Sequence, residues 1–311
     1  MIGPLDRREF LRQSMAAGAA ALGVEAFAAG ALGEVVAAAK PAKAPAKPGA
    51  KMRFGLVTYL WARDWDLPTL IANCEKARVL GVELRTTHAH RVEPKLKPKQ
   101  RKEVKKRFAD SPVVLVGLGS NERFDDPDPA KLKKAIEATK AFVKLSHDVG
   151  GSGVKVKPNS FHRNVPREKT IEQIGRSLNV VGKFAADYGQ QIRLEVHGQC
   201  AELPTIKKIM DVATHPSVAV CWNSNGTDLK GKGLEYNFNL VKKRFGATAH
   251  VRAFNHSKYP WQQLINLFVK MDYKGWILLE AGARVKDRVA ALAEQRELFE
   301  AMVAKARRGR S

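Results

Sequence analysis

Four short apolar segments in the C-terminal half of the chain each carry a side chain that could bind a cation. They supply Glu195, Asn223, His250 and Glu280, and the last of these closes the run Trp-Ile-Leu-Leu. Two carboxylates, an imidazole and an amide oxygen suit Mn²⁺, Mg²⁺ or Zn²⁺ and leave coordination positions for substrate oxygens. If the four segments are neighbouring strands, these residues predict a divalent metal site.

Lysine and histidine side chains follow two earlier apolar segments. Lys155 and Lys157 could hold an anionic or enolate oxygen by charge. A lysine at the end of a strand, as Lys157 is, is however often a solvated side chain without such a role. His88 and His90 are candidates for substrate contact, and exposed loop histidines without a function are equally common. All four residues are therefore candidates for substrate binding.

Three further candidates for substrate binding lie next to the predicted metal ligands. His197 lies two residues after Glu195 and therefore on the same face of a strand, where it could act as a ligand or orient the substrate. Asn225 closes the sixth apolar segment. Arg252 lies two residues after His250 and would therefore face the same side of a strand. A guanidinium group that faces the site could clamp a substrate oxygen.

The elements that must position these residues alternate regularly from residue 53 onward. Short β-rich segments are expected at 54–59, 82–86, 113–118, 154–157, 192–196, 218–222, 249–254 and 276–280. Helical patterns are expected at 67–80, 98–109, 129–149, 167–188, 203–214, 234–245, 261–271 and 287–305. Alternation of this kind predicts parallel strands that are joined by crossover helices.

Eight such units in about 250 residues match a single (β/α)8 TIM barrel of the α/β class better than an open sheet. No GxGxxG motif opens a helix after the first strand, which argues against a dinucleotide-binding fold. In such barrels the chemistry lies at the carboxyl ends of the strands. The candidate ligands are therefore expected together, at the ends of strands five to eight.

The chain resembles the xylose isomerase-like TIM barrels, a family of sugar phosphate isomerases and epimerases, from about Met52 to Met302. The resemblance lies in four phrases taken in order, which are residues 81–84, 194–198, 250–252 and 273–280. It implies a metal that is held by residues of strands five to eight, which here are Glu195, Asn223, His250 and Glu280. It also implies that Glu195 and Glu280 are catalytic and transfer protons on opposite faces of a ketose.

Two positions depart from the pattern of that family. Asn223 stands where the family usually has aspartate, and an amide in place of a carboxylate removes one negative charge and weakens the hold on a divalent cation. The seventh segment reads His250-Val251-Arg252-Ala253, where the family often ends in aspartate. A divalent metal ion therefore remains the expected cofactor, in an altered centre.

The leading functional hypothesis is a metal-assisted isomerase or epimerase that acts on a small carbohydrate or keto-sugar by proton transfer next to a carbonyl. The same proton abstraction could drive elimination, so a lyase or dehydratase acting on an oxidised sugar is the alternative. A non-catalytic carbohydrate-binding barrel is a third interpretation, in which Asn223 marks lost metal affinity. Abasic-site endonucleases share the barrel but carry many more metal ligands, so no nucleic-acid partner is expected.

The N-terminal region is expected to direct export. Its residues 6–12, DRREFLR, resemble the twin-arginine signal, and an Ala/Gly-rich apolar stretch follows. The expected organisation is a signal peptide at 1–39, a Pro/Ala/Lys linker at 40–51, the barrel at 52–306 and a basic tail at 307–311. The protein is therefore expected in the periplasm, or anchored to the membrane if the signal stays uncleaved. After the signal the sequence has no apolar run of 18 residues, so no membrane span is expected in the mature chain.

The composition is strongly basic. The chain has 54 Lys and Arg residues against 31 Asp and Glu residues, a formal net charge of +23. Most of these cations fall in the predicted outer helices, so a solvated basic shell is expected, and its field attracts anions. The three cysteines are odd in number and widely separated, and they fit no disulfide framework. No sequence feature predicts an oligomeric state.

Overall fold

The structure is a computed structural model that describes residues 51–255 and 258–309. By its internal contacts the chain divides into a unit of residues 1–45 and a unit of residues 46–311. The predicted signal peptide at 1–39, nearly all of the predicted linker and the end of the predicted basic tail lie outside the described residues. None of the described helices is long and apolar enough to cross a membrane.

Eight parallel strands close into one barrel in sequence order, which confirms the predicted (β/α)8 fold. The strands are β1 (Arg53–Val57), β2 (Gly81–Arg85), β3 (Val114–Arg123), β4 (Gly153–Lys157), β5 (Gln191–Glu195), β6 (Val218–Asn223), β7 (Phe245–Val251) and β8 (Trp276–Leu279). Because β8 pairs with β1, no strand edge remains open. All carboxyl ends of the strands therefore meet at one mouth.

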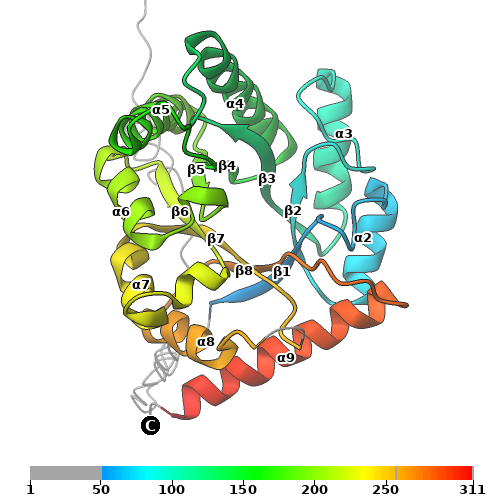
Figure 1. Cartoon of the computed structure of the whole chain (residues 1–311). Helices are drawn as coiled ribbons and strands as arrows, with labels where there is room; N and C mark the ends of the chain where they lie inside the picture. Colours follow the sequence, from blue (N-terminus) through cyan, green and yellow to red (C-terminus); the bar gives the residue numbers. More distant parts are fainter. Residues whose placement is uncertain (1–50, 256–257, 310–311) are drawn as a thin grey trace, which may run out of the picture. The chain divides into compact units, whose positions relative to one another are not determined.

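Helices surround the barrel and cover the outer faces of its strands (Figure 1). They are α2 (Leu67–Lys76), α3 (Pro98–Ala109), α4 (Pro129–Val149), α5 (Arg167–Asp187), α6 (Leu203–Val212), α7 (Gly233–Val241), α8 (Trp261–Lys270) and α9 (Arg288–Arg308). Short 3₁₀ turns occur at Gly198–Cys200, Gly226–Leu229 and Lys242–Arg244. Local chemistry sets the helix starts, as at α2, where the Asp66 carboxylate accepts from the Thr69 backbone N–H at 2.9 Å.

The strands divide their side chains between two environments with a period of two residues. Outward side chains such as Leu84, Val156 and Leu194 join the large apolar core beneath the helices. The inward positions between them carry charged or polar groups toward the mouth and a small apolar cluster lower down. This second cluster contains Val57, Val116, Trp276 and Leu278.

The amino end of the barrel interior is closed by the buried side chain of Arg193 on β5. Its guanidinium donates to the Val116 carbonyl at 3.3 Å, to the Ser152 hydroxyl at 2.7 Å and to the Gln191 side-chain oxygen at 3.0 Å. Gly153 makes room for this group, because an added Cβ would lie 3.0 Å from the guanidinium carbon and 2.4 Å from the Gln191 carbonyl oxygen. The interior is therefore filled below the mouth.

Two strands differ from their predicted bounds by more than two residues. The seventh was predicted at 249–254 but begins at Phe245, because Gly246 lies inside the strand rather than after a helix. A Cβ on Gly246 would lie 2.6 Å from the Gln191 side-chain oxygen, so close packing rather than helix capping requires the glycine. The third strand was predicted to end at residue 118 but continues to Arg123 through polar residues that rise to the mouth.

Candidate active site

Three of the predicted metal ligands converge inside the barrel mouth. Glu195 ends β5, His250 lies within β7, and Glu280 directly follows β8. Each offers one ligand atom, and these atoms all lie within 4.8 Å of one another. Glu195 and His250 are buried and Glu280 is half-buried, so the group lies at the boundary between the interior and the opening.

Asn223, the fourth predicted ligand, ends β6 and links the two glutamates. Its side-chain Nδ2 donates to Glu195 Oε1 at 2.8 Å and to Glu280 Oε2 at 3.2 Å. Its own Oδ1 is buried and has no hydrogen-bond partner among the described residues. Because a half-turn of the amide exchanges its oxygen and nitrogen, this group can also present an oxygen to a cation. The donor set thus fits a divalent metal ion.

Lys155 on β4 was predicted to bind substrate, and the structure places its ammonium against a catalytic candidate. Lys155 Nζ lies 2.8 Å from Glu195 Oε2, and both side chains are buried. Burial alone would raise the pKa of Glu195, but Lys155 and His250 outweigh it and hold that pKa well below its usual range. Lys155 therefore keeps Glu195 ionised, ready to accept a proton or bind a cation.

Glu83 on β2 was absent from the predicted site residues. It is fully buried, and its Oε1 lies 3.3 Å from His250 Nε2, while His250 Nδ1 lies 3.4 Å from Glu195 Oε1. A carboxylate on the far side of an imidazole fixes the ring and its tautomer, and it strengthens the ring as a metal ligand. One acid in the otherwise apolar strand Gly-Val-Glu-Leu was the sequence feature that could have identified it.

Three other predicted substrate contacts surround the opening, and all are half-buried. His88 Nδ1 lies 3.3 Å from the Thr58 hydroxyl, and burial together with nearby Arg85 lowers the pKa of His88 to about 4. Burial also lowers the pKa of His197. Lys157 ends β4, and burial with the charge of Lys155 lowers its pKa to about 8. Neutral imidazoles and an easily deprotonated ammonium thus line the entrance.

The remaining predicted contacts have other roles in the structure. Both ring nitrogens of His90 bond to the backbone, one to the Arg85 carbonyl at 2.8 Å and one to the Val92 N–H at 3.0 Å. The Asn225 amide donates to the carbonyls of Val196 and Asn223, each at 2.9 Å, and so ties the ends of β5 and β6 together. These contacts leave His90 and Asn225 supporting loops rather than presenting free donors to the opening.

Arg252 was predicted to face the mouth because it shares the parity of His250. The strand ends at Val251, so the period-two alternation stops before Arg252, and its side chain is exposed. Its backbone N–H donates to the Ser224 hydroxyl at 3.1 Å. The predicted guanidinium clamp therefore has no support from strand geometry.

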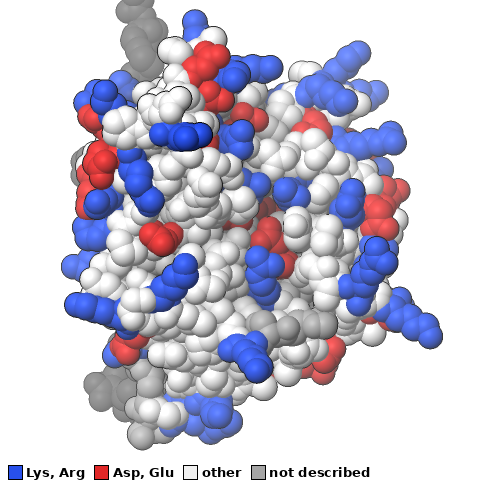
Figure 2. All heavy atoms as spheres, viewed as in Figure 1, with Lys and Arg blue, Asp and Glu red and all other residues white. Residues whose placement is uncertain are grey.

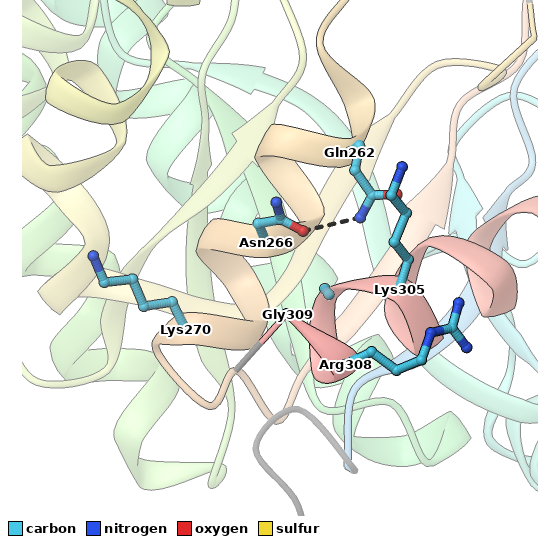
Figure 3. Close-up of a pocket in the computed structure, with 7 residues that line it drawn as sticks. Gln262, Asn266, Lys270, Lys305, Arg308 and Gly309 are labelled. Atoms are coloured by element: carbon cyan, nitrogen blue, oxygen red, sulfur yellow. Dashed lines mark hydrogen bonds between the residues drawn. The ribbon is translucent and has the colours of Figure 1, made fainter. Parts of the chain in front are cut away.

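Charge is unevenly distributed over the face that opens onto the site. Figure 2 shows acidic side chains recessed in a hollow at the centre of this face, with basic side chains around it. A second hollow of about 690 Å³ lies on the outside of the barrel, between α8 and α9 (Figure 3). Its described lining has no carboxylate or histidine and consists of Gln262, Asn266, Lys270, Lys305, Ala306, Arg308 and Gly309. The groups suited to proton transfer therefore lie at the barrel mouth.

A closed parallel barrel with carboxylate and imidazole groups gathered at the ends of its last four strands defines a TIM barrel with a candidate metal centre. The sequence profile described as "Xylose isomerase-like TIM barrel" matches residues 71–302. The chain therefore belongs to the xylose isomerase-like TIM barrel family, as its sequence predicted. Among curated proteins, none matches this chain in sequence.

Similar folds occur in solved structures at low sequence identity. An L-ribulose 3-epimerase is 14% identical, with a TM-score of 0.70 over 83% of this chain and 96% of its own. The IOLI protein with a bound zinc atom is 14% identical, with a TM-score of 0.68 over 82% and 98%. The probable 3-DHS dehydratase AsbF from Bacillus anthracis is 12% identical, with a TM-score of 0.62 over 80% and 99%. At such identities the likeness shows the fold alone.

Proposed function

We propose that this barrel is a metal-assisted isomerase or epimerase acting on a small carbohydrate or keto-sugar. The observation that carries the proposal is the convergence of Glu195 and Glu280 with His250 within 4.8 Å. Two carboxylates joined through one amide donor can approach a bound sugar from two sides. The epimerase among the structural neighbours adds support from a chain of the same fold.

Glu195, His250 and Glu280 would hold the metal ion, with the Asn223 amide turned to offer its oxygen. When bound, a divalent ion supplies Lewis-acid polarisation of a substrate carbonyl. Glu195, kept ionised by Lys155, accepts the proton from the carbon next to that carbonyl. Glu280 is half-buried, so it can take up a proton from solvent, and it would return that proton to the sugar from the other side. Glu195 would then release its own proton to solvent, which restores both carboxyl groups and leaves the sugar with the same atoms.

Elimination is the second candidate reaction at the same site. After the same proton abstraction, loss of a hydroxyl group from the neighbouring carbon needs a proton donor near the opening. Lys157 meets this need, because burial lowers its pKa to about 8 and its proton is easily transferred near neutral pH. A probable dehydratase is among the structures of similar fold.

Metal analysis and isotope exchange test the proposal directly. We expect a stoichiometric divalent ion in the purified protein and uptake of solvent deuterium into a recovered keto-sugar without fragmentation. Glu195→Gln should reduce the exchange about 100-fold or more, because general base catalysis contributes at least that much. Glu168→Gln, at an exposed position on α5, is the matched control and should leave the exchange unchanged.

Two results would redirect the assignment. Loss of water from the sugar, with a dehydrated product, would favour the lyase reaction over isomerisation. A protein without a stoichiometric divalent ion, in which Glu195→Gln leaves sugar binding unchanged, would indicate a non-catalytic carbohydrate-binding barrel.

A further inference from the structure

A basic group that takes no part in the proton transfer between Glu195 and Glu280 lies on the opposite side of the mouth. Arg85 ends β2, Lys157 ends β4, and Asn121 lies on β3 between them. Arg85 Nη2 and Lys157 Nζ both donate to Asn121 Oδ1, at 3.4 Å and 3.2 Å. Within the described part of the chain, neither cation has a carboxylate oxygen within 4.0 Å. Two positive charges thus share one neutral oxygen.

The Tyr59 ring and the turn that follows β2 fix the position of Arg85 in this basic group. The Arg85 guanidinium lies over the Tyr59 ring, 5.0 Å from its centre. The backbone turns sharply afterwards, and Thr87 has a φ of +67°, which is costly for a β-branched residue. Glu93 holds the turn by accepting from the Thr87 N–H at 2.6 Å and from the Thr86 hydroxyl at 2.7 Å. The Glu93 carboxylate is therefore used to fix the loop and does not neutralise Arg85.

The basic group and the proton-transfer site lie within reach of one small molecule. Lys155 and Lys157 are on the same strand and both point inward, with Lys155 in contact with Glu195. Lys157 lies two residues nearer the opening, which is about 7 Å along the strand. The mouth is thus divided, with Glu195 and Glu280 at the ends of β5 and β8 on one side and Arg85 and Lys157 at the ends of β2 and β4 on the other.

We propose that Arg85, Lys157 and the Asn121 amide bind an anionic substituent of the substrate, a carboxylate or a phosphate, while its carbonyl end lies at Glu195. The planar guanidinium fork matches the two oxygens of such an anion, and the lysine adds a second charge. The net charge of +23 draws anions to the protein from a distance. This assignment rests on the proposed function, because it places one sugar across both halves of the mouth.

Calorimetric titration of the full chain tests the assignment without requiring turnover. The probes are D-glucuronate, D-glucose 6-phosphate and neutral D-glucose, each with EDTA and again with Mn²⁺. We expect at least one anionic probe to bind about tenfold or more tightly than glucose, as charge-assisted hydrogen bonds predict. Whichever of the two anionic probes binds more tightly shows whether the site prefers a carboxylate or a phosphate.

Charge-matched variants separate a binding site from a general field. Arg85→Gln with Lys157→Gln should weaken the anionic probe about tenfold or more and leave glucose unchanged. Arg78→Gln with Lys133→Gln removes the same charge from two exposed positions, one in the turn after α2 and one on α4, and should change neither affinity. The single change Lys157→Gln, with unaltered thermal unfolding, guards against a folding defect and should show part of the loss.

Equal affinity of wild-type protein for glucuronate, glucose 6-phosphate and glucose would overturn the assignment, as would equal losses in the two double variants. Failure of the proposed function gives a different pattern. Anionic probes would then still bind through Arg85 and Lys157, while deuterium exchange stayed absent. Exchange of a neutral keto-sugar without any preference for anions would support the isomerase and remove the anion site.

Discussion

The Asn223 amide determines the charge balance at the centre of the site. It donates to the carboxylates of Glu195 and Glu280, which lie on either side of it, and adds no charge of its own. An aspartate there would bring a third carboxylate into hydrogen-bond distance of the other two. Without a cation the three carboxylates would repel one another, and with a cation they would bind it more strongly than two carboxylates do.

Asn223→Asp should therefore act in opposite directions on two measurements. Affinity for Mn²⁺ or Zn²⁺ should rise about tenfold or more, the range over which groups around a metal change its binding. The thermal midpoint in EDTA should fall, since the added carboxylate is buried beside two others. Asn239→Asp, an exposed change on α7, should alter neither quantity. An unchanged metal affinity would place residue 223 outside the coordination sphere.

Single residues of the site were predictable only where their position in a strand indicated a role. Strand order alone brought Glu195, Asn223, His250 and Glu280 to one place. Glu83 was missed because its partner, His250, is distant in sequence and their contact depends on closure of the barrel. The backbone contacts of His90 and Asn225 could not be predicted for a related reason. Backbone carbonyls and N–H groups of the same loop can take up their donors and acceptors, and no sequence pattern records this.

At the scale of the strands, packing around Arg193 explains why β4 begins with glycine. An alanine at Gly153 would place its Cβ against the Gln191 backbone, which is itself held in the barrel ladder. Gly153→Ala should lower the free energy of unfolding by about 1–3 kcal/mol, the usual cost of overpacking. Denaturant unfolding at equilibrium measures this difference.

Gly226→Ala is the matched control, because nothing lies within 4 Å of a Cβ added there. It should change the free energy of unfolding by less than about 0.5 kcal/mol, as surface substitutions usually do. Equal effects of the two substitutions would show that β4 can shift to accept a side chain.

Element order was fully predictable from the alternation of apolar segments and helical patterns, whereas strand bounds were not. From the sequence alone, a glycine such as Gly246 could equally cap a helix or lie in a closely packed strand. Only the neighbour that would meet its Cβ distinguishes the two, and that neighbour, Gln191, lies on another strand. The polar end of β3 was missed because its inward side chains serve the opening rather than the core.

For the molecule as a whole, one buried acid should make stability depend on pH. Asp228 accepts from the Tyr259 hydroxyl at 2.7 Å and from the Asn225 N–H at 2.8 Å, and its Oδ1 is buried without a hydrogen-bond partner among the described residues. Burial raises the pKa of Asp228 from 3.8 to about 7. Between these values the folded chain binds the extra proton and the unfolded chain does not, so stability falls as pH rises from about 4 to about 7.

Asp228→Asn should remove this part of the pH dependence. Between pH 5 and pH 8 the wild-type protein should lose more unfolding free energy than the variant, by about 2–3 kcal/mol. Thermal or denaturant unfolding of both proteins across this range provides the comparison, and other titrating groups cancel in the difference. Parallel pH profiles would show that Asp228 titrates alike in the folded and unfolded chains.

The filled amino end of the barrel has a kinetic consequence. Arg193 and the apolar cluster around Trp276 occupy the interior below the proton-transfer groups, so molecules enter and leave by the same opening. Under the proposed function, a product would have to leave before the next substrate could bind, and the two would compete for one binding site. Substrate and product would then share this opening, because the described interior offers no second route through the barrel.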